Sequence, residues 1–498
     1  MLARLLLCQI LFLGSLNGQA QELYHMGLLE DDGQYDQLPC KADLQKKDYS
    51  QLPSSHSLKI YCPKAMSQGS YGTCVGWSTA YAARTIAEAI KWGWTDQAKI
   101  CKEAFSPLFV YAQIKKGGDN NCSVGANIHE ALKLMKDVGS VKYAAFNTLC
   151  ADYVSQQLKH EASKYKINDF FTLFNKNSSP FISKVAKVKK AISENNPVII
   201  GMKVPKSFHR AGSVWTEGGE GTGRHALCVV GYDDYKNGGA FQVMNSWGTS
   251  WGDNGFTWIR YSDFEKYVNH AYEIYVKRIN LLENYPDSHQ QSRQEISFRE
   301  RNPISPRNNS PIGNISGSIT DQQSLKLNNL SGSVSLQLSG GERIGSAFNR
   351  QQGTYNLTRR LVQGNRFQLF VTNYEPAYVY VIGFDASNHT TKLFPDKDNV
   401  SAAMTYKSSH LIIPGEDDYF KVDNMDEIKN ICILYSKEPL NFNQIIDRIN
   451  SAHGSYTQKV RSAISDSIIP TSQVSFLSNS ISYQVQAEKS IVPVFIGL

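Results

Sequence analysis

Hydrophobic and polar residues alternate with two different periods in the first 280 residues of the chain. Helical spacing predicts helices at about 74–91, 105–116 and 127–137. The first carries four residues on one side: Trp77, Tyr81, Thr85 and Ala89. Strand-like apolar runs follow at 197–204, 225–232, 241–247, 255–261 and 271–277. Helices first and antiparallel-type strands later are typical of an α+β fold with segregated halves.

The pattern changes in the second part of the chain. Residues 281–323 are dominated by Ser, Asn, Gln, Pro and Arg and hold few apolar residues to bury, so we interpret them as a linker. Strand patterns then return, separated by turn residues, at 332–338, 366–373, 377–384, 410–415 and 430–436. One helix is predicted at 439–452 from apolar residues at helical spacing. We therefore predict a separate β-rich domain with a helix at 324–498.

The N-terminus has the pattern of a secretory signal peptide at 1–20. Arg4 supplies the positive charge, an apolar run extends from Leu5 to Leu13, and Gly18 and Ala20 are the small residues of a cleavage site. The apolar run is too short to span a bilayer, and no later stretch of comparable character is long enough. We expect a secreted or periplasmic protein without an integral membrane segment after signal removal. Residues 21–51 would form a short N-terminal segment.

Composition narrows the class of protein further. The chain has 498 residues, of which 41% are hydrophobic and 19% charged, which is typical of globular proteins and excludes a wholly disordered chain. The net charge of +7 is a mild excess over this length, and no long run of Lys and Arg focuses it. We therefore expect no nucleic-acid partner.

Export would permit disulfide bonds among the cysteines that follow the signal. Cys228 lies in an apolar strand-like run and Cys432 is isolated, so both are predicted to be buried free thiols. If Cys74 is a free nucleophile, the bridges draw on five residues with one left over: Cys40, Cys62, Cys101, Cys122 and Cys150. The pairing among them stays open.

Three side chains have the chemistry required for catalysis by a thiol. Cys74 begins a predicted helix, whose N-terminal N–H groups would stabilise the thiolate and lower the cysteine pKa. His225 opens a strand and could take the thiol proton and later return it. Asn245 ends the next strand, where its amide could fix the histidine tautomer, with the ring of Trp247 excluding water. Taken singly, each residue also has an ordinary structural interpretation.

Together, the segments around these residues resemble the papain-like cysteine peptidases. The resemblance rests on three stretches: Gln68-Gly69 with four residues before Cys74, Arg224-His225-Ala226, and Asn245-Ser246-Trp247-Gly248. Cys74 precedes His225 by roughly 150 residues, which agrees with the order and spacing of that family. The resemblance implies a two-lobed domain at 52–280, with a helical lobe and an antiparallel β lobe.

The resemblance also implies an exported endopeptidase that acts on peptide or protein substrates and needs neither a cofactor nor a metal. Cys74 would be the nucleophile, His225 its proton partner and Asn245 the residue that orients the histidine. Gln68 and the backbone N–H of Cys74 would form an oxyanion hole. Gly125 would pair its backbone with an extended peptide.

The chain departs from the family pattern at several positions. Tyr71 stands where the family has a disulfide-forming cysteine, Val75 replaces the tryptophan after the nucleophile, and Val124-Gly125 replaces a double glycine. Only about thirty residues separate the signal from Leu52, which is too short for the family's usual inhibitory propeptide. We therefore expect latency to be absent or differently arranged, and a divergent, bacterial branch of the family.

Two other functions stay open on the same fold: a non-catalytic binding or scaffolding protein, and an acyltransferase. The peptidase is favoured because all four residue types of the site are present. The C-terminal part faintly resembles a β-rich domain of unknown function that follows peptidase domains, and we expect it to bind a surface or a partner protein. Its aromatic residues Tyr378, Tyr380 and Phe384 favour a half-buried sheet face over a binding face. Asp233 and Asp234 favour a solvated loop over a metal site.

Overall fold

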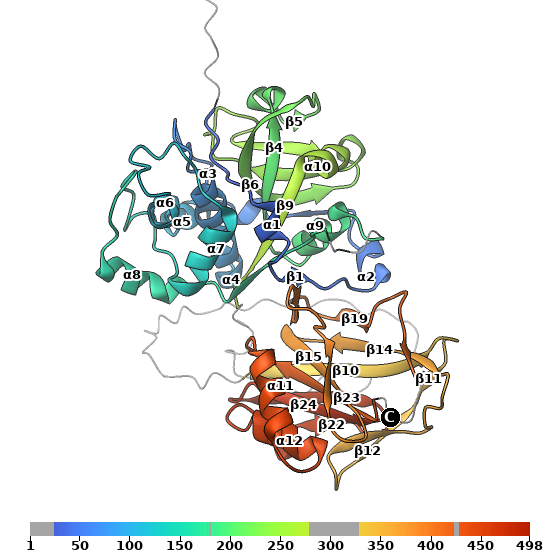
Figure 1. Ribbon diagram of the computed structural model, residues 1–498. Helices are drawn as coiled ribbons and strands as arrows, with labels where there is room; N and C mark the ends of the chain where they lie inside the picture. The colour runs from blue at the N-terminus through green and yellow to red at the C-terminus, as the bar shows by residue number, and fades with distance from the viewer. Residues whose placement is uncertain (1–23, 177, 179–180, 278–327, 423–427) are drawn as a thin grey trace, which may run out of the picture.

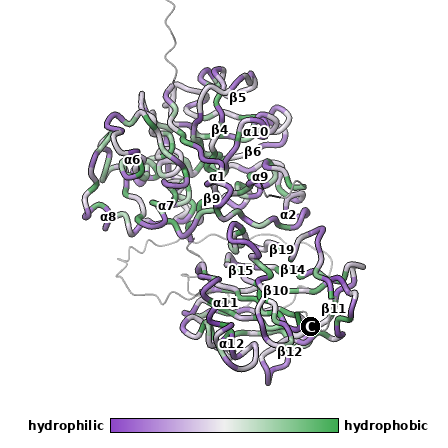
Figure 2. The backbone as a smooth tube through the Cα atoms, viewed as in Figure 1, coloured by the Kyte–Doolittle hydropathy of each residue, from purple (hydrophilic) through white to green (hydrophobic). Residues whose placement is uncertain are grey.

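The computed structural model describes residues 24–176, 178, 181–277, 328–422 and 428–498. These residues form two halves, drawn in blue to green and in yellow-orange to red in Figure 1. Each half encloses hydrophobic clusters, and Figure 2 shows hydrophobic positions along the inner elements of both. The predicted signal peptide (1–20) and linker (281–323) lie outside the described residues. Within the described ranges, no helix combines the length and apolar character needed to cross a membrane.

One long helix forms the centre of the helical lobe in the first half. It consists of three consecutive segments: α3 (Cys74–Gly76), the π-helical η2 (Trp77–Arg84) and α4 (Thr85–Trp92). The other two predicted helices are present as α6 (Pro107–Ile114) and α7 (Ile128–Asp137). Ser106 caps α6 by accepting a hydrogen bond from the N–H of Phe109, with Pro107 at the first helical position. All three helices therefore confirm the sequence prediction.

Shorter elements complete the first half. The remaining α-helices are α1 (Asp32–Tyr35), α2 (Lys46–Ser50), α5 (Gln97–Lys102), α8 (Gln156–Ala162), α9 (Lys184–Ser193) and α10 (Tyr261–Tyr267). The 3₁₀ turns are η1 (Lys59–Tyr61), η3 (Ser163–Tyr165), η4 (Lys206–Arg210) and η5 (Lys236–Gly238). Most of these elements lie at the periphery of the core, where they carry the chain between the helical lobe and the sheet.

A mixed sheet forms the second lobe of this half. Its strands are β1 (Cys40–Lys41), β2 (Ser55–Ser57), β3 (Asp169–Thr172), β4 (Val198–Pro205), β5 (Val214–Trp215), β6 (Gly221–Asp233), β7 (Ala240–Met244), β8 (Phe256–Arg260), β9 (Val268–Tyr275) and, from the second half, β17 (Val400–Ser401). The strand order is β17-β1-β3-β9-β4-β6-β7-β8-β5, with β2 paired to β6. The five strands expected between 197 and 277 are thus confirmed, and they pair antiparallel as expected.

The second half, which we call the accessory domain, is a two-sheet sandwich with two helices. Its further strands are β10 (Asn328–Leu338), β11 (Arg343–Ile344), β12 (Ser346–Asn349), β13 (Thr354–Leu357), β14 (Arg366–Asn373), β15 (Ala377–Phe384), β16 (Thr390–Phe394), β18 (Ala403–Met404), β19 (Ser409–Ile413), β20 (Phe420–Lys421), β21 (Asn430–Ser436), β22 (Ser475–Phe476), β23 (Ile481–Ala487) and β24 (Ile491–Gly497). The helices are α11 (Phe442–Ser451) and α12 (Tyr456–Ala463), with a short η7 (Thr471–Gln473). The predicted strands and the helix at 439–452 are confirmed.

Both faces of β15 are covered, which explains its continuous burial. One face, with Val379 and Val381, points into the core between the two sheets. The other face packs on the helices: the ring of Tyr380 lies 5.0 Å from that of Phe442, and Phe384 lies in the same helix-covered cluster. The aromatic residues of this strand therefore form a packed sheet face, as the sequence favoured.

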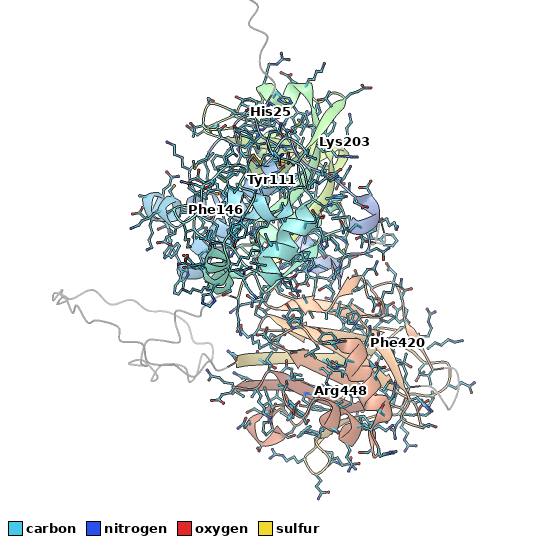
Figure 3. All side chains as sticks on the ribbon, turned by 60° about the vertical axis from the view of Figure 1, so that its left-hand side comes forward. His25, Tyr111, Phe146, Lys203, Phe420 and Arg448 are labelled. Atoms are coloured by element: carbon cyan, nitrogen blue, oxygen red, sulfur yellow. A yellow bond between two sulfur atoms is a disulfide. The ribbon has the colours of Figure 1, made fainter. Side chains whose placement is uncertain are left out.

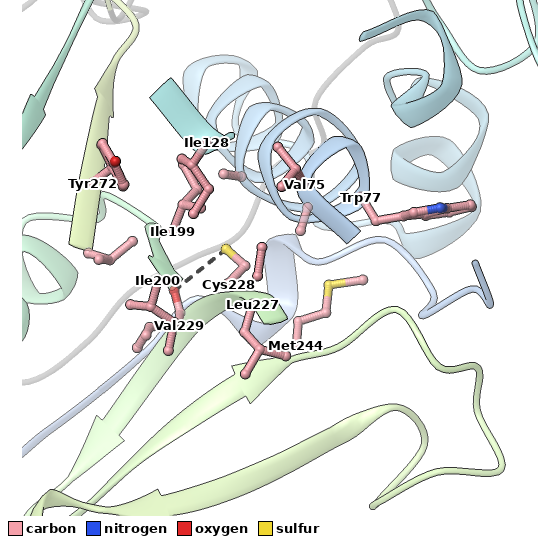
Figure 4. Packing of buried hydrophobic residues seen from close by; sticks show 14 of the residues in the cluster. Val75, Trp77, Ile128, Ile199, Ile200, Leu227, Cys228, Val229, Met244 and Tyr272 are labelled. Atoms are coloured by element: carbon pink, nitrogen blue, oxygen red, sulfur yellow. Dashed lines mark hydrogen bonds between the residues drawn. The ribbon is translucent and has the colours of Figure 1, made fainter. Parts of the chain in front are cut away.

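The cysteines follow the prediction only in part. A disulfide joins Cys122 to Cys150, whereas Cys40, Cys62 and Cys101 carry no disulfide among the described residues. The expectation of a second bridge among these three is therefore wrong. Cys228 and Cys432 are buried free thiols, as predicted. Figure 4 shows Cys228 packed among apolar side chains of the core, with its thiol directed at the carbonyl of Val229.

Candidate active site

Cys74 lies at the first position of the long central helix and is completely buried. The backbone N–H groups of Ala226 and Gly27 come within hydrogen-bonding reach of its sulfur. Ala226 follows His225 on β6, so the start of the helix lies against the part of the sheet that carries His225. Cys74 and His225 are 151 positions apart in the chain.

His225 is held from the neighbouring strand by an amide. Because β6 and β7 are antiparallel neighbours, Asn245, which follows β7 directly, reaches the histidine across the sheet. His225 Nε2 lies 2.8 Å from Asn245 Oδ1, and an amide oxygen only accepts, so Nε2 carries the proton. His225 Nδ1 has no hydrogen-bond partner among the described residues. Nδ1, the ring nitrogen without a partner, is therefore the one that could exchange a proton with a thiol.

Trp247 covers the contact between these two side chains. Its ring stacks on the imidazole of His225 with 4.5 Å between centroids, and both residues are almost inaccessible to solvent. A second histidine, His209, stacks on the same indole at 4.9 Å. The hydrogen bond between His225 and Asn245 is thus shielded from water, which strengthens it.

Gln68 is fixed so that its amide N–H groups point into the same site. Its Oε1 accepts a hydrogen bond from the hydroxyl of Ser246 at 2.6 Å, and its backbone N–H donates to the carbonyl of Ser246 at 2.8 Å. Its Nε2 donates to the carbonyls of Tyr71 at 2.6 Å and of His25 at 3.2 Å. Trp247 Nε1 donates to the same His25 carbonyl at 3.1 Å. The carbonyl oxygen of His25 therefore occupies the position toward which the Gln68 amide donates.

That oxygen belongs to an N-terminal strap, residues 24–51, whose first portion (residues 24–30) fills the site. In Figure 3, His25 lies on the same half of the molecule as Tyr111. The Tyr24 ring stacks on Trp247 at 4.8 Å, and its N–H donates to His209 Nδ1 at 3.1 Å. The burial of Cys74 and His225 is thus explained in part by a segment of the same chain lying over them.

The strap is seated by backbone pairing with both walls of the site. Leu29 donates to the Ala126 carbonyl and Ala126 donates to the Gly27 carbonyl, each at 2.9 Å, in a parallel bridge. On the other wall, Leu28 donates to the carbonyl of Arg224 at 3.3 Å. A Cβ atom on Gly27 would collide with the carbonyl oxygen of Gly72, so this position of the strap accepts only glycine.

Gly125 was expected to supply the backbone pairing to an extended peptide. In the closed site its N–H donates instead to the hydroxyl of Tyr111 at 3.0 Å, and Ala126 is the residue that pairs with the strap. Gly125 has a φ of +96°, and a Cβ on it would collide with the carbonyl of Gly27. In the structure, Gly125 allows its backbone to approach that of Gly27 closely. The pairing of Gly125 with a substrate stays a prediction.

Charged side chains fasten the strap beside the site. Glu30, whose side chain is only 1% exposed, lies 2.6 Å from Arg224 Nε, next to His225 in the chain. His270 Nε2 lies 2.9 Å from Asp32, and its other nitrogen faces Glu30 at 4.0 Å. Glu30, Asp32 and His270 could together surround a cation, but Arg224 already supplies the positive charge to Glu30. We interpret the group as an ionic fastening of the strap.

Burial dominates the electrostatics of the closed site. Burial raises the pKa of Cys74 to about 11, although the N–H groups of Ala226 and Gly27 act in the opposite direction. The expectation that the helix N-terminus leaves a lowered pKa is therefore wrong for the closed chain, because loss of water around the sulfur outweighs the helix. Burial also lowers the pKa of His225 to about 4, against the hydrogen bond to Asn245. Both groups are neutral at pH 7 in this form.

The sequence did not identify residues 24–30 or His209 as parts of the site. The strap has no periodic pattern, and its contacts are made with residues more than forty positions away along the chain. The single glycine inside an apolar stretch is the only local signal of a close approach. Asp234, in contrast, forms a part-buried ion pair with Lys189 at 2.7 Å, so the solvated-loop interpretation holds only in part.

Comparison with known proteins covers both halves. Residues 59–276 match the family model described as papain family cysteine protease, and residues 360–439 match a domain of unknown function (DUF4384). The two ranges lie inside the segments expected at 52–280 and 324–498, whose exact boundaries stay predictions.

Individual relatives cover short parts of the chain. Cathepsin B-like cysteine proteinase 1 of Ostertagia ostertagi is 36% identical over 74 residues, which are 14% of this chain and 22% of that protein. Cysteine proteinase 3 of Entamoeba histolytica is 36% identical over 70 residues, 13% of this chain and 23% of that protein. The chain thus matches less than a quarter of the length of either. Among solved structures, xylellain, a cysteine protease from Xylella fastidiosa, aligns with a TM-score of 0.42 and 21% identity over 51% of this chain and 96% of that one.

Proposed function

We propose that this chain, whose residues 59–276 form a papain family cysteine protease domain, is an exported cysteine endopeptidase kept closed by its own strap. The observation that carries the proposal is the arrangement of His225 on Asn245 at 2.8 Å under Trp247, with the backbone N–H of Ala226, the residue after His225, directed at the Cys74 sulfur. This arrangement leaves the histidine nitrogen without an amide partner free to accept the thiol proton.

In the open site, a substrate carbonyl would take the position of the His25 carbonyl. Proton transfer from Cys74 to His225 gives a thiolate and an imidazolium, and the thiolate attacks the carbonyl carbon. Gln68 Nε2 and the Cys74 N–H stabilise the oxyanion. His225 then protonates the leaving amine, and a thioester to Cys74 remains. A water molecule deprotonated by His225 hydrolyses the thioester and releases the acid.

Opening of the strap is the step that makes the site reactive. In the closed chain burial keeps the pKa of Cys74 near 11 and that of His225 near 4, so the reactive ion pair is disfavoured. Departure of residues 24–30 would return water and substrate to both groups. The short N-terminal segment thus provides the latency for which the sequence offered no long propeptide.

The test is labelling of Cys74 by a peptidyl epoxide that alkylates activated thiols. We compare the full chain with its Gly27→Ala variant, because the new methyl group collides with the Gly72 carbonyl and displaces the strap. Gly33→Ala is the matched control, since its Cβ meets Asp31 only at 3.4 Å, an ordinary contact. Rapid labelling at Cys74 in Gly27→Ala, slow labelling in the other two, and loss on His225→Ala are expected.

Absence of labelling in folded Gly27→Ala protein would refute the proposal and favour the binding or scaffolding alternative. Product analysis separates hydrolysis from acyl transfer, because the thioester yields a free acid with water and an amide with an added amine. The predicted signal peptide and the Cys122–Cys150 disulfide support export, since such bonds persist in oxidising compartments. Mass determination of the N-terminus of the exported chain tests the cleavage site after Ala20.

A further inference from the structure

The second portion of the strap, residues 36–48, is held by the accessory domain. Asn399 donates from its side chain to the carbonyl of Asp36 at 3.2 Å and accepts from the N–H of Cys40 at 2.9 Å. Further along, the N–H of Gln45 donates to the carbonyl of His410 at 3.0 Å. The same continuous segment therefore contacts both the active-site cleft and the accessory domain.

Strand β1 is the centre of this junction. It lies between β17 of the accessory domain and β3 of the peptidase half, so that Cys40 is opposite Val400 on one side and Thr172 on the other. Figure 1 shows β1 at the boundary between the two halves. The strap thus extends the peptidase sheet and at the same time supplies the edge to which the accessory domain adds a strand.

A buried ion pair stabilises the strap at β1. Lys41 Nζ lies 2.9 Å from Glu273 Oε1 on β9 and donates to the hydroxyl of Thr405 at 2.6 Å. The ring of Tyr406 faces the ammonium at 3.3 Å, and its hydroxyl donates to the second oxygen of Glu273. Residues from the strap, the peptidase half and the accessory domain therefore satisfy one another in a site with little access to water.

A hydrogen-bonded Asp–His pair also joins the strap to the accessory domain, without a residue of the peptidase half. Asp48 accepts from the backbone N–H of His410 at 3.0 Å and from its ring Nδ1 at 2.8 Å. The Asp48 side chain is 9% exposed and that of His410 is 33% exposed. Because the peptidase half takes no part in the Asp48–His410 pair, either residue can be substituted without changing the cleft or its walls.

We propose that the accessory domain anchors the strap. By binding residues 36–48, it keeps residues 24–30 in the cleft. Loss of these contacts opens the active site. The occupant of this face of the accessory domain is thus a segment of the same chain. The accessory domain would thus have a regulatory role. This proposal rests on the proposed function only because the cleft that the strap covers is taken to be the active site.

The junction, meaning the contacts of residues 36–48 with the accessory domain, adds to contacts that the strap makes with the peptidase half itself. The Tyr35 hydroxyl donates to the carbonyl of Phe174 at 2.7 Å, and β1 pairs with β3. The junction therefore further restricts a segment that the peptidase half already orders, and it raises the population of the closed strap. Cleft closure and junction formation are thus coupled, and each favours the other.

The experiment breaks the Asp48–His410 pair in the full chain. We measure hydrogen exchange at the amides of Leu29 and Ala126, which close the strap onto the wall, together with the rate of epoxide labelling at Cys74. In His410→Ala, both are expected to rise about twofold to fivefold, as loss of one partly exposed pair would give. Asp48→Ala is expected to match it, and the double variant is expected to add nothing to either single change.

The matched control is His389→Ala, which removes another His–Asp pair of the accessory domain, to Asp385 at 3.3 Å, without contact to the strap. It is expected to leave both rates unchanged. Reciprocally, Gly27→Ala is expected to speed exchange at the Cys40 amide. Unchanged exchange at Leu29 and Ala126 in His410→Ala, with its fold intact by exchange elsewhere, overturns the inference; labelling of Cys74 in Gly27→Ala then still supports the proposed function.

Discussion

In the proposed function, Gln68 would serve both the closed and the open forms of the site. Ser246 fixes its oxygen, which leaves Nε2 directed at the carbonyl of His25. A substrate oxyanion in that position would meet a donor that needs no reorganisation. Such preorganised donors contribute about 3 kcal/mol to transition-state binding.

We predict that Gln68→Ala in the Gly27→Ala background lowers kcat about 10²-fold to 10³-fold. KM is expected to change little, because the donor acts on the developing charge. Gln113→Ala is the control, since that amide donates to the carbonyl of Phe109 within α6. Steady-state kinetics on a fluorogenic peptide gives both constants, and an equal loss in kcat for the control would contradict the assignment.

The titration of His225 reports whether the strap is closed. Burial holds its pKa near 4 in the closed chain, and the nearby His209 acts in the same direction. We predict that displacement of the strap by Gly27→Ala raises the midpoint toward the ordinary value of about 6.5. Proton NMR of the imidazole ring measures it. His129 on α7, whose pKa is lowered by burial outside the cleft, is expected to titrate identically in both chains.

The sign of the pH effect follows from this difference. The closed form binds fewer protons at His225 than the open form between pH 6.5 and 4, so closure is stable above this window and weakens as pH falls through it. Glu30 acts oppositely, because burial raises its pKa and protonation favours the closed form at lower pH. Identical His225 midpoints in the closed and displaced chains would contradict the burial argument.

At the scale of elements, one contact that holds the strap lies where it crosses β6. Glu30 is buried against Arg224, and removing one partner of such a pair leaves the other charge without compensation. We predict that Arg224→Met releases the strap and raises the rate of Cys74 labelling at least tenfold. Arg260→Met removes a similar pair with Asp263, away from the strap, and is expected to have no effect on labelling.

The elements also show what the sequence could and could not predict. The helix from Cys74 and the strands of the sheet were predictable, because each has an apolar face whose period is local. The papain-like motifs indicated Gln68, His225 and Asn245 because each motif is a short, local stretch of sequence. Residues 24–30 have no such period, since every contact that orders them comes from another part of the chain. The pKa of Cys74 was mispredicted for this reason too: the helix is local, but the burial that outweighs it comes from distant parts of the chain, the strap among them.

At the scale of the whole molecule, the two halves meet through a charged group that water hardly reaches. Burial lowers the pKa of Lys41 to about 8, against the attraction of Glu273. Lys41 is therefore still mostly protonated at neutral pH, and Glu273 is the main group that favours its charged form. The junction between the halves depends on this pair more than on exposed ion pairs such as that of Lys277 with Glu438.

We predict that Lys41→Met lowers the free energy of unfolding by about 3–5 kcal/mol, because Glu273 is left buried without its cation. Lys277→Met is expected to cost less than about 1 kcal/mol. Denaturant unfolding monitored by tryptophan fluorescence measures both. Combining Lys41→Met with Glu273→Leu is expected to restore part of the loss, and a double variant no more stable than the single one would argue against a charge effect.

The disulfide between Cys122 and Cys150 has a consequence for where the chain can be rigid. Cys122 lies just before the wall at Gly125 and Ala126 that holds the strap, and the bridge closes a loop of 28 residues, a constraint worth about 3–4 kcal/mol. In a glutathione-rich cytosol the two thiols would stay reduced and the wall would lack this constraint. The chain would therefore be a looser protein in a reducing compartment than in an oxidising one, where the bridge stiffens the wall that holds the strap.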